Sequence, residues 1–498
     1  MFDYSVFERA CDISLVAYEV PISRDYKVWI NGTEVPVYTC RVSAYPFNIE
    51  WPGHQRPLEQ SEEVSYVNFV SDEAIEIAVE PLTKTAYERI MIKPYAKKIA
   101  FWKHENQIVF RLKQNGGYVL ELDDYHGLLY LFNHAPIASP SPEEVTYYFG
   151  SGVHFPGKLA LKSGESVYID KNALVYGCIY AENAENIHIY GNGIMDDSCE
   201  ERVAPYCYDA FCNGNLKFYD CKNIRVEGIG LVNSAIWCVN LFHCFDAVLD
   251  GINVFGQWRY NTDGIDIVNS QRITVKNSFI HSFDDTVTIK GIDRYAFENN
   301  RDILVENCVL WCDWGKTMEI GLETECEEYA HIIFRGCDLL RAGNTACDIQ
   351  NGDRAYVHDV VFENISMELE DFYTPSELQD RAEKVYDRNG EIEIACLLNI
   401  TNRRYRGKEQ ENCEGAKSPS FAGVDGITVK NVQVYCGEKI MAAHGTQCVK
   451  IRVRNGFPAT RYRNIVVENV YLNGVKVTEE EMSVGVRGTE RECLEIRA

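Results

Sequence analysis

The segment Ile273-Thr274-Val275-Lys276-Asn277 is one copy of a short pattern that recurs through the second part of the chain. Each copy alternates apolar and polar residues and ends in Asn or Gly. Most successive copies lie 23–30 residues apart, which is the period of a parallel β-helix whose repeats each form one coil. Asn and Gly tolerate the left-handed backbone conformation, so the terminal residues predict the corners between strands. These corners are Gly228, Gly251, Asn277, Asn307, Gly336, Asn364, Asn431 and Asn469.

One gap between copies is much longer and predicts an insertion. It covers roughly 371–425 and is polar and charged, as in Gln379-Asp380-Arg381-Ala382-Glu383-Lys384. We expect a loop or short helix beside the solenoid here rather than another coil. Long loops on one face of a solenoid often border its binding site.

The first 140 residues have a different texture, with short β segments separated by turn residues. Tyr26–Ile30 precedes Asn31-Gly32, and Gln107–Leu112 precedes Asn115-Gly116-Gly117. Asn-Gly between apolar runs is a strong hairpin signal, and several such runs predict an antiparallel sandwich. A Pro-rich linker follows over 135–142. The chain is therefore expected to be all-β, with a β-sandwich domain over 1–140 and a parallel β-helix domain over 145–498.

The charge balance narrows the classes of partner. The chain of 498 residues has 49 Lys+Arg against 74 Asp+Glu, a net charge of −25. Such acidity disfavours nucleic acid and anionic membranes as partners. No apolar run reaches the roughly 18 residues that a membrane-spanning helix needs. The oligomeric state leaves no trace in the sequence.

Cysteine usage and the first residues bear on localisation. The 19 cysteines show no paired zinc-type spacing, and we expect mostly buried, reduced thiols in a cytosolic protein, with a few disulfides of an exported protein as the alternative. The start, Met1-Phe2-Asp3-Tyr4, has neither the basic nor the apolar region of a secretory signal. The expected location is the cytoplasm.

Two acidic clusters point to chemistry. The first is Asn261-Thr262-Asp263-Gly264-Ile265-Asp266 and the second begins with Asp284-Asp285. Asp263 and Asp285 are 22 residues apart, about one coil, so stacking brings their carboxylates together. Neighbouring carboxylates push their pKa values apart, as an acid and a base in glycoside hydrolysis require. Each motif alone is also an ordinary turn, but the two together favour catalysis.

Residues around these clusters are candidates for binding substrate. Trp258 and Arg259 precede the first cluster, where an aromatic face stacks on a sugar ring and a guanidinium donates to hydroxyls. Asn261 opens the cluster, and Glu319 follows nearby. Lys290 and Lys316 are either substrate donors or charge partners of the acidic cluster. Asp266 lies three residues from Asp263 and is expected on the opposite face of a regular strand, in a structural role.

No cofactor and no metal are expected. The 11 histidines form no zinc-type pair. The sequence has no EF-hand loop, and its Gly191-x-Gly193 turn is not a dinucleotide fingerprint.

Together the two acidic clusters resemble the catalytic signature of the polygalacturonases, glycoside hydrolase family 28. The segments 233–237 and 189–196 are similar to two further motifs of that family, and the resemblance covers roughly 145–475. It implies a right-handed parallel β-helix that hydrolyses a polysaccharide with inversion. It also implies catalytic roles for Asp263, Asp284 and Asp285, with Asp285 favoured as general acid and the other aspartates activating water.

Other features resemble a related group, the dextranases and isopullulanases of family 49, which carry a β-sandwich before the helix. Lys316 stands where the polygalacturonases have a histidine, and Asp348-Ile349-Gln350 stands where they have an Arg-Ile-Lys segment that grips a uronate. A site without those cations suits an anionic sugar poorly. We therefore expect cleavage of α-linked glycans of neutral sugars. The alternatives are a polygalacturonase, a non-catalytic glycan-binding β-helix and a polysaccharide lyase.

Overall fold

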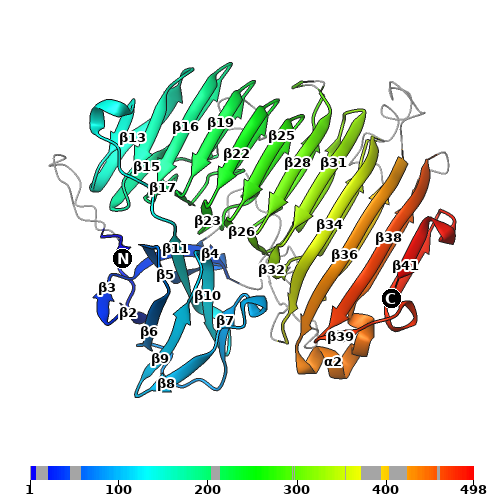
Figure 1. Cartoon of the computed structure of the whole chain (residues 1–498), viewed down its shortest axis with the longest axis horizontal. Coiled ribbons are helices and arrows are strands. Elements are labelled where there is room, and N and C mark those ends of the chain that lie inside the picture. Colours follow the sequence, from blue (N-terminus) through cyan, green and yellow to red (C-terminus); the bar gives the residue numbers. More distant parts are fainter. Residues whose placement is uncertain are drawn as a thin grey trace.

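The computed structural model describes residues 2–6, 21–44, 58–202, 214–293, 295–296, 298–353, 355–371, 394–402, 423–456 and 460–497. These residues form strands almost throughout, which confirms the predicted all-β class. Figure 1 shows a long ladder of strands, with two smaller N-terminal sheets (blue) beside its first half.

The N-terminal part forms the two sheets expected of a β-sandwich. Their strand pairs are antiparallel except for β5 with β11, which run parallel. The first sheet contains β1 (Phe2–Tyr4), β4 (Tyr38–Ser43), β5 (Ser61–Ser71), β7 (Ile90–Lys93), β10 (Gly116–Leu122) and β11 (Asp124–His134). The second contains β2 (Tyr26–Ile30), β3 (Thr33–Val35), β6 (Ile75–Pro81), β8 (Phe101–His104) and β9 (Gln107–Leu112).

Of the two predicted hairpin turns, one is confirmed and one is wrong. Asn31-Gly32 joins β2 to β3, with Ile30 paired to Thr33. After Leu112, by contrast, the chain leaves the second sheet and enters the first, so β9 and β10 are not partners. Asn115 stabilises the connection between the two sheets, since its side-chain amide donates to the carbonyl oxygens of Ser71 and His134.

The remaining chain forms a parallel β-helix of three strand stacks. The first stack contains β12 (Tyr147–Phe149), β14 (Ser166–Ile169), β16 (Glu185–Gly191), β19 (Lys222–Glu227), β22 (Phe245–Asp250), β25 (Gln271–Lys276), β28 (Asn300–Glu306), β31 (Glu328–Arg335), β34 (Tyr356–Leu369), β36 (Gly423–Cys436), β38 (Arg461–Leu472) and β41 (Leu494–Arg497). The second contains β17 (Ile194–Asp196), β20 (Gly230–Val232), β23 (Asn253–Phe255), β26 (Phe279–Ser282), β29 (Val309–Cys312) and β32 (Asp338–Ala342). The third contains β15 (Ala173–Glu182), β18 (Leu216–Tyr219), β21 (Val239–Phe242), β24 (Ile265–Val268), β27 (Val287–Gly291), β30 (Lys316–Thr324), β33 (Thr345–Asn351), β35 (Cys396–Asn402), β37 (Lys450–Asn455) and β40 (Ser483–Arg487). At the start of the solenoid, β13 (Gly152–Leu161) pairs in parallel with β15. Outside the stacks lie the short β39 (Val475–Lys476), which pairs antiparallel with β38, and a helix, α2 (Glu438–His444).

The predicted corners are confirmed. All eight terminal Asn and Gly residues have φ between 53° and 75°. Asparagine corners also bond along the stack: Asn431 donates to Asn364 at 3.0 Å, and Asn469 donates to Asn431 at 3.1 Å. The repeat therefore encodes both the turn and a contact between coils.

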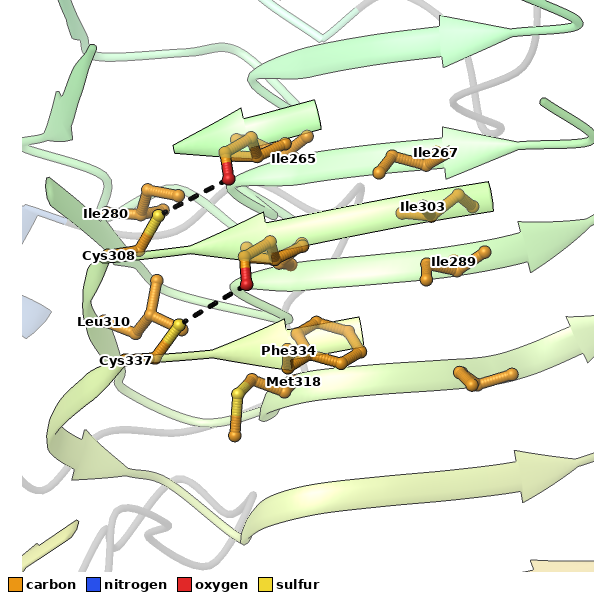
Figure 2. Packing of buried hydrophobic residues seen from close by; sticks show 14 of the residues in the cluster. Ile265, Ile267, Ile280, Ile289, Ile303, Cys308, Leu310, Met318, Phe334 and Cys337 are labelled. Atoms are coloured by element: carbon orange, nitrogen blue, oxygen red, sulfur yellow. Dashed lines mark hydrogen bonds between the residues drawn. The ribbon is translucent and has the colours of Figure 1, made fainter. Parts of the chain in front are cut away.

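The interior of the solenoid is a continuous apolar core. Figure 2 shows Ile267 stacked on Ile289 of the next coil, while the thiols of Cys308 and Cys337 each bond to a carbonyl oxygen of the preceding coil. Thirteen of the fifteen described cysteines are buried free thiols. For the described residues this confirms the predicted burial of the thiols.

The sandwich packs on the outer face of the second stack through an aromatic layer. Phe132 of β11 lies 4.5 Å from the Phe255 ring and 5.3 Å from the Phe279 ring, measured between centroids. Gly117 permits this approach, because a Cβ there would lie 2.4 Å from the Phe279 ring. Large buried aromatic contacts of this kind make the two parts one packed unit.

A buried ionic cluster spans the same junction. Lys93 of β7 lies 3.0 Å from Glu121, 3.3 Å from Glu368 and 3.3 Å from Glu370, the last two on and just after β34. Burial raises the pKa of Glu121 to about 7 and that of Glu368 to about 8. One ammonium thus holds three carboxyl groups in an environment that disfavours charge.

The prediction for the insertion is partly wrong. Within 371–425, β35 (Cys396–Asn402) is a strand of the third stack, paired with β33 and β37. Its segment Leu398–Asn402 has the same alternation and terminal Asn as the other copies, but it lies in the third stack, whereas the copies that the pattern identified lie in the first. The parts at 372–393 and 403–422 lie outside the described residues.

Candidate active site

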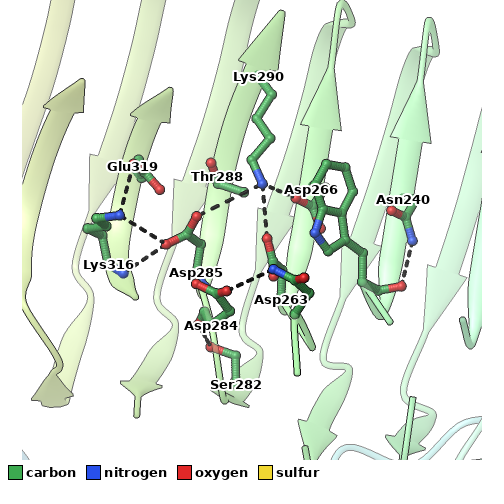
Figure 3. Close-up of polar contacts among 12 residues, drawn as sticks. Asn240, Asp263, Asp266, Ser282, Asp284, Asp285, Thr288, Lys290, Lys316 and Glu319 are labelled. Atoms are coloured by element: carbon green, nitrogen blue, oxygen red, sulfur yellow. Dashed lines mark hydrogen bonds and ion pairs between the residues drawn. The ribbon is translucent and has the colours of Figure 1, made fainter. Parts of the chain in front are cut away.

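The two acidic clusters meet at adjacent coils of the third stack, as predicted. Asp263 lies in the turn before β24, and Asp284 and Asp285 lie between β26 and β27. Because β24 pairs with β27, the two turns stack, and Gly264 donates a 2.8 Å backbone bond to Asp285. Figure 3 shows the three carboxylates converging.

Lys290 lies at the centre of this cluster. Its ammonium donates to Asp263 and to Asp266, each at 2.9 Å, and lies 3.9 Å from Asp285 Oδ2. Burial opposes the charge, but Asp263 and Asp266 outweigh it and raise the pKa of the Lys290 ammonium. Of the two readings of Lys290, the contacts favour the charge partner.

The prediction for Asp266 is wrong. Asp266 points to the same side as Asp263 and shares its lysine. The alternation argument assumed one regular strand, but β24 begins at Ile265, so Asp263 precedes the strand in a turn. Asp266 instead belongs to a row along the third stack: Asn240, Asp266, Thr288, Glu319, Asp348 and Asn399.

Asp285 is surrounded by positive charge. Its Oδ1 accepts the Lys316 backbone N–H at 2.9 Å, and the Lys316 ammonium lies 3.9 Å from the same oxygen. Burial favours the neutral acid, yet the ammonium groups of Lys316 and Lys290 outweigh it and lower the pKa of Asp285. Asp285 is therefore the ionised member of the pair.

Asp284 has the opposite environment. Asn261 donates to its Oδ2 at 3.1 Å, and the Asp285 backbone N–H donates to its Oδ1 at 3.0 Å. Burial and the adjacent charge of Asp285 raise the pKa of Asp284 to about 7. Gly315 makes room for the pair, since a Cβ there would lie 2.4–2.6 Å from both carboxylates.

Asn261 and Glu319 join the cluster as supports. The Asn261 carbonyl accepts from Arg202 at 2.9 Å, which fixes the amide that binds Asp284. Glu319 is fully buried, lies 3.8 Å from the Lys316 ammonium and accepts from Gln350 at 3.1 Å. Burial, followed by the charge of Asp285, raises the pKa of Glu319 well above its usual range.

Trp258 and Arg259 lie apart from the carboxylates. Arg259 donates to the carbonyl oxygens of Glu200 at 2.6 Å and Ser198 at 3.2 Å, and its guanidinium lies over the Trp258 ring. Both residues line a separate cavity of about 240 Å³ between the solenoid and the sandwich.

Residue-by-residue prediction missed two members of the site. The Trp237 ring lies 3.9 Å below the Lys290 ammonium, although the sequence marked it only as part of a familiar segment. Asp348 is fully buried, accepts from Asn399 at 2.6 Å and has its pKa raised by burial to about 6. Strand pairing places Asp348 beside Glu319 in the same outward-facing row, and this register could have identified Asp348 from the sequence.

The described residues include no group of three or more His, Cys, Asp or Glu arranged to hold a metal ion. In the same ranges, no helix is long and apolar enough to cross a membrane.

Carboxylates from successive coils, gathered on the outside of a parallel β-helix, define the class of β-helix glycoside hydrolases. Residues 145–439 match the family described as Glycosyl hydrolases family 28. The chain belongs to this family, which confirms the resemblance inferred from the two acidic clusters.

Similar proteins agree on family and fold. A probable polygalacturonase of Arabidopsis thaliana is 24% identical over 200 residues, covering 38% of this chain and 43% of that protein. A polygalacturonase of Persea americana is 26% identical over 211 residues, covering 41% and 42%. The chain thus spans about two fifths of the length of these curated relatives. Dex49A from Penicillium minioluteum has a similar fold, with a TM-score of 0.62 at 13% identity over 99% of this chain and 92% of that one.

Proposed function

We propose that this protein is an inverting glycoside hydrolase that cleaves α-glycosidic bonds in a glycan of neutral sugars. One observation carries the proposal: Asp284 and Asp285 lie side by side in unlike environments, which raise the pKa of Asp284 by burial and lower that of Asp285 through two nearby ammonium groups, and Lys290 lies between Asp285 and Asp263. Inversion requires one carboxylic acid for the leaving group and one carboxylate for water. When neighbouring carboxyl groups have different environments, their pKa values move apart, and the group with the higher pKa serves as the acid.

Asp284 is the better general acid. The sequence favoured Asp285, but two ammonium groups near Asp285 stabilise its ionised form. Asp284 has its pKa raised to about 7 by burial and by Asp285, so a large fraction of it keeps its proton near neutral pH. A general acid with a pKa near the working pH transfers its proton efficiently.

Asp263 and Asp285 then activate the water. Lys290 donates to Asp263 at 2.9 Å and lies 3.9 Å from Asp285, so one ammonium orients both carboxylates. The ammonium favours the ionised form of both carboxylates, but burial and the neighbouring aspartates still raise the pKa of Asp263 well above its usual range, so Asp285, whose pKa is lowered, is the stronger candidate to accept the proton from water. Lys290 is a positioning residue in this scheme.

The charge of the site supports a neutral sugar. Six carboxyl groups surround two lysines: Asp263, Asp266, Asp284, Asp285, Glu319 and Asp348 with Lys290 and Lys316. Gln350 bonds Glu319 rather than supplying a cation for a uronate. An anionic sugar would enter this field against repulsion. The resemblance to family 49, which rests on a β-sandwich before the β-helix, is the other support for a neutral sugar.

Family membership and the polygalacturonase relatives favour a second candidate, hydrolysis of polygalacturonate.

The free buried thiols further support a cytoplasmic location.

A screen of dextran, pullulan, polygalacturonate and their oligosaccharides separates these candidates. We expect new reducing ends from a neutral glycan, with proton NMR detecting the inverted anomer first. Release from polygalacturonate alone would replace the neutral sugar with the second candidate. An unsaturated, ultraviolet-absorbing product would identify a lyase, and binding without cleavage would identify a glycan-binding protein.

A further inference from the structure

A cavity of about 240 Å³ lies at the junction of the sandwich and the first coils. One wall comes from β4 and β5 of the sandwich, and the other comes from turns that follow the second stack. Figure 1 shows β4 next to the end of β23. Residues from the two walls include Thr39, Arg41 and Tyr66 on one side and Asp196, Asn233 and Trp258 on the other.

The cavity lies in the same row of turns as the proposed acid. Asp196 ends β17, Asn233 follows β20, and Asp284 follows β26. These strands belong to one stack, in the order β17, β20, β23 and β26. At about 4.8 Å per coil, the cavity lies within roughly 14 Å of Asp284 along the helix axis. A glycan chain laid along this row would reach both places.

The polar groups of the cavity are fixed in place. Asp196 is 9% exposed, and its two oxygens accept from Asn233 at 3.0 Å and from the Ser198 backbone at 2.7 Å. Arg259 holds the 198–200 turn through its carbonyl oxygens. Such preorganised donors and acceptors fix the orientation of a polar ligand.

Aromatic rings supply the apolar part. Trp258 and Tyr176 line the cavity. Phe155, 45% exposed, stacks on Tyr176 with ring centroids 5.0 Å apart. Aromatic faces beside hydrogen-bonding groups suit the alternating apolar and hydroxyl surfaces of a sugar ring.

The cavity is balanced in charge, unlike the catalytic cluster. Arg41 pairs with Glu63 at 2.7 Å, and Arg259 stands near Asp196. Two guanidinium groups thus face two carboxylates, which suits an uncharged ligand.

We propose that this cavity is a sugar-binding subsite, completed by the sandwich domain, that holds a neutral sugar unit of the substrate chain at a distance from the bond that is cleaved. The inference rests on the proposed function. It assigns the N-terminal sandwich a part in substrate recognition, because one wall of the subsite belongs to β4 and β5.

The test compares substrates that reach the cavity with substrates that do not. Isomalto-oligosaccharides of increasing length, and oligogalacturonides of the same lengths, are assayed with Thr39→Trp, which fills the cavity from the sandwich side. Loss of a few contacts predicts about a tenfold lower kcat/KM for the long oligosaccharides, with the shortest cleaved substrate unchanged. Thr33→Trp, an exposed threonine on the other sheet, is the matched control and should leave every length unchanged.

Arg41→Ala repeats the test by removing a group rather than adding one. In an Asp284→Asn background, calorimetry with the same oligosaccharides should show weaker binding of the long ones only. If wild-type protein cleaves glycans but both variants affect all lengths equally, or none, the subsite is overturned while hydrolysis stands. If wild-type protein cleaves nothing, the proposed function itself fails.

Discussion

The Lys290 ammonium lies 3.9 Å from the centre of the Trp237 ring. The ring faces the charge with its negative π surface, which stabilises a cation that has little access to water. The ammonium thus contacts the Trp237 ring as well as the carboxylates of Asp263 and Asp266, which accept its hydrogen bonds. This arrangement makes Lys290 the electrostatic centre of the site.

Replacing Lys290 by Met should harm both activity and stability. Without the ammonium, Asp263 and Asp266 remain buried with no cation, a loss that costs about 3–5 kcal/mol for buried pairs. Chemical denaturation and initial rates measure the two effects. Lys276→Met is the matched control, because its pair with Asp250 is half-exposed and such pairs are worth about 0–1 kcal/mol. Equal losses in both variants would contradict a central role for Lys290.

Asp284→Asn should abolish most hydrolysis while leaving the fold intact. The amide retains the shape of the carboxyl group but cannot donate the proton, so kcat should fall by about 10²–10⁴-fold. Reducing-end assays measure the rate, and thermal denaturation checks the fold. Asp284 would lose its assignment if the variant kept more than about a tenth of wild-type activity.

Activity should fall as pH rises through about 7. The proton on Asp284 is lost there, since its pKa is raised to about 7 by burial and by Asp285. Lys316 opposes this shift, so Lys316→Met should move the alkaline limb of kcat/KM to higher pH. An alkaline limb that stays in place, or moves to lower pH, would contradict this account of Asp284.

The junction cluster should make stability depend on pH. Glu368 has a pKa of about 8 in the folded protein, raised by burial from its ordinary value of 4.5. The folded state therefore binds more protons, and the free energy of unfolding should fall as pH rises from about 4.5 to 8, by about 1.4 kcal/mol for each unit per proton.

Glu368→Gln isolates this contribution, because the amide stays neutral at every pH. Denaturant titrations between pH 5.5 and 8.5 should show a shallower fall in this variant than in wild type. Glu363→Gln, at a half-buried position of the same strand, should follow the wild-type slope. Parallel curves for all three proteins would show that Glu368 does not titrate in this range.

The corners of the solenoid offer a test of local structure. Asn431 has φ of 56° and donates to Asn364 at 3.0 Å. Asn431→Ala should lower the free energy of unfolding by about 1–2 kcal/mol, because Cβ disfavours the left-handed conformation in a residue without a local hydrogen bond. Asn431→Gly should cost less, and a larger cost for glycine than for alanine would contradict the conformational explanation.

Features of the fold encoded within one coil could be predicted from the sequence. The alternation in Ile273–Asn277 and the terminal asparagine are local properties, and they fix the strand, its inward face and the left-handed corner. The spacing between Asp263 and Asp285 also suffices, because stacking converts one period into proximity. The same local pattern is present in Leu398–Asn402 of β35, a strand of the third stack that the prediction assigned to the insertion.

Other features depend on which surfaces pack together, and only the tertiary structure decided them. Asp266 joined the cluster because the strand begins after Asp263, and the pKa of Asp285 is lowered while that of Asp284 is raised because two lysines from different strands lie near Asp285. The contact of the sandwich with the second stack is likewise made by residues far apart in sequence, such as Phe132 and Phe255. A repeat determines its own geometry through short-range sterics and hydrogen bonds. The charge of a buried carboxyl group, in contrast, depends on every group within a few ångströms, whatever its place in the chain.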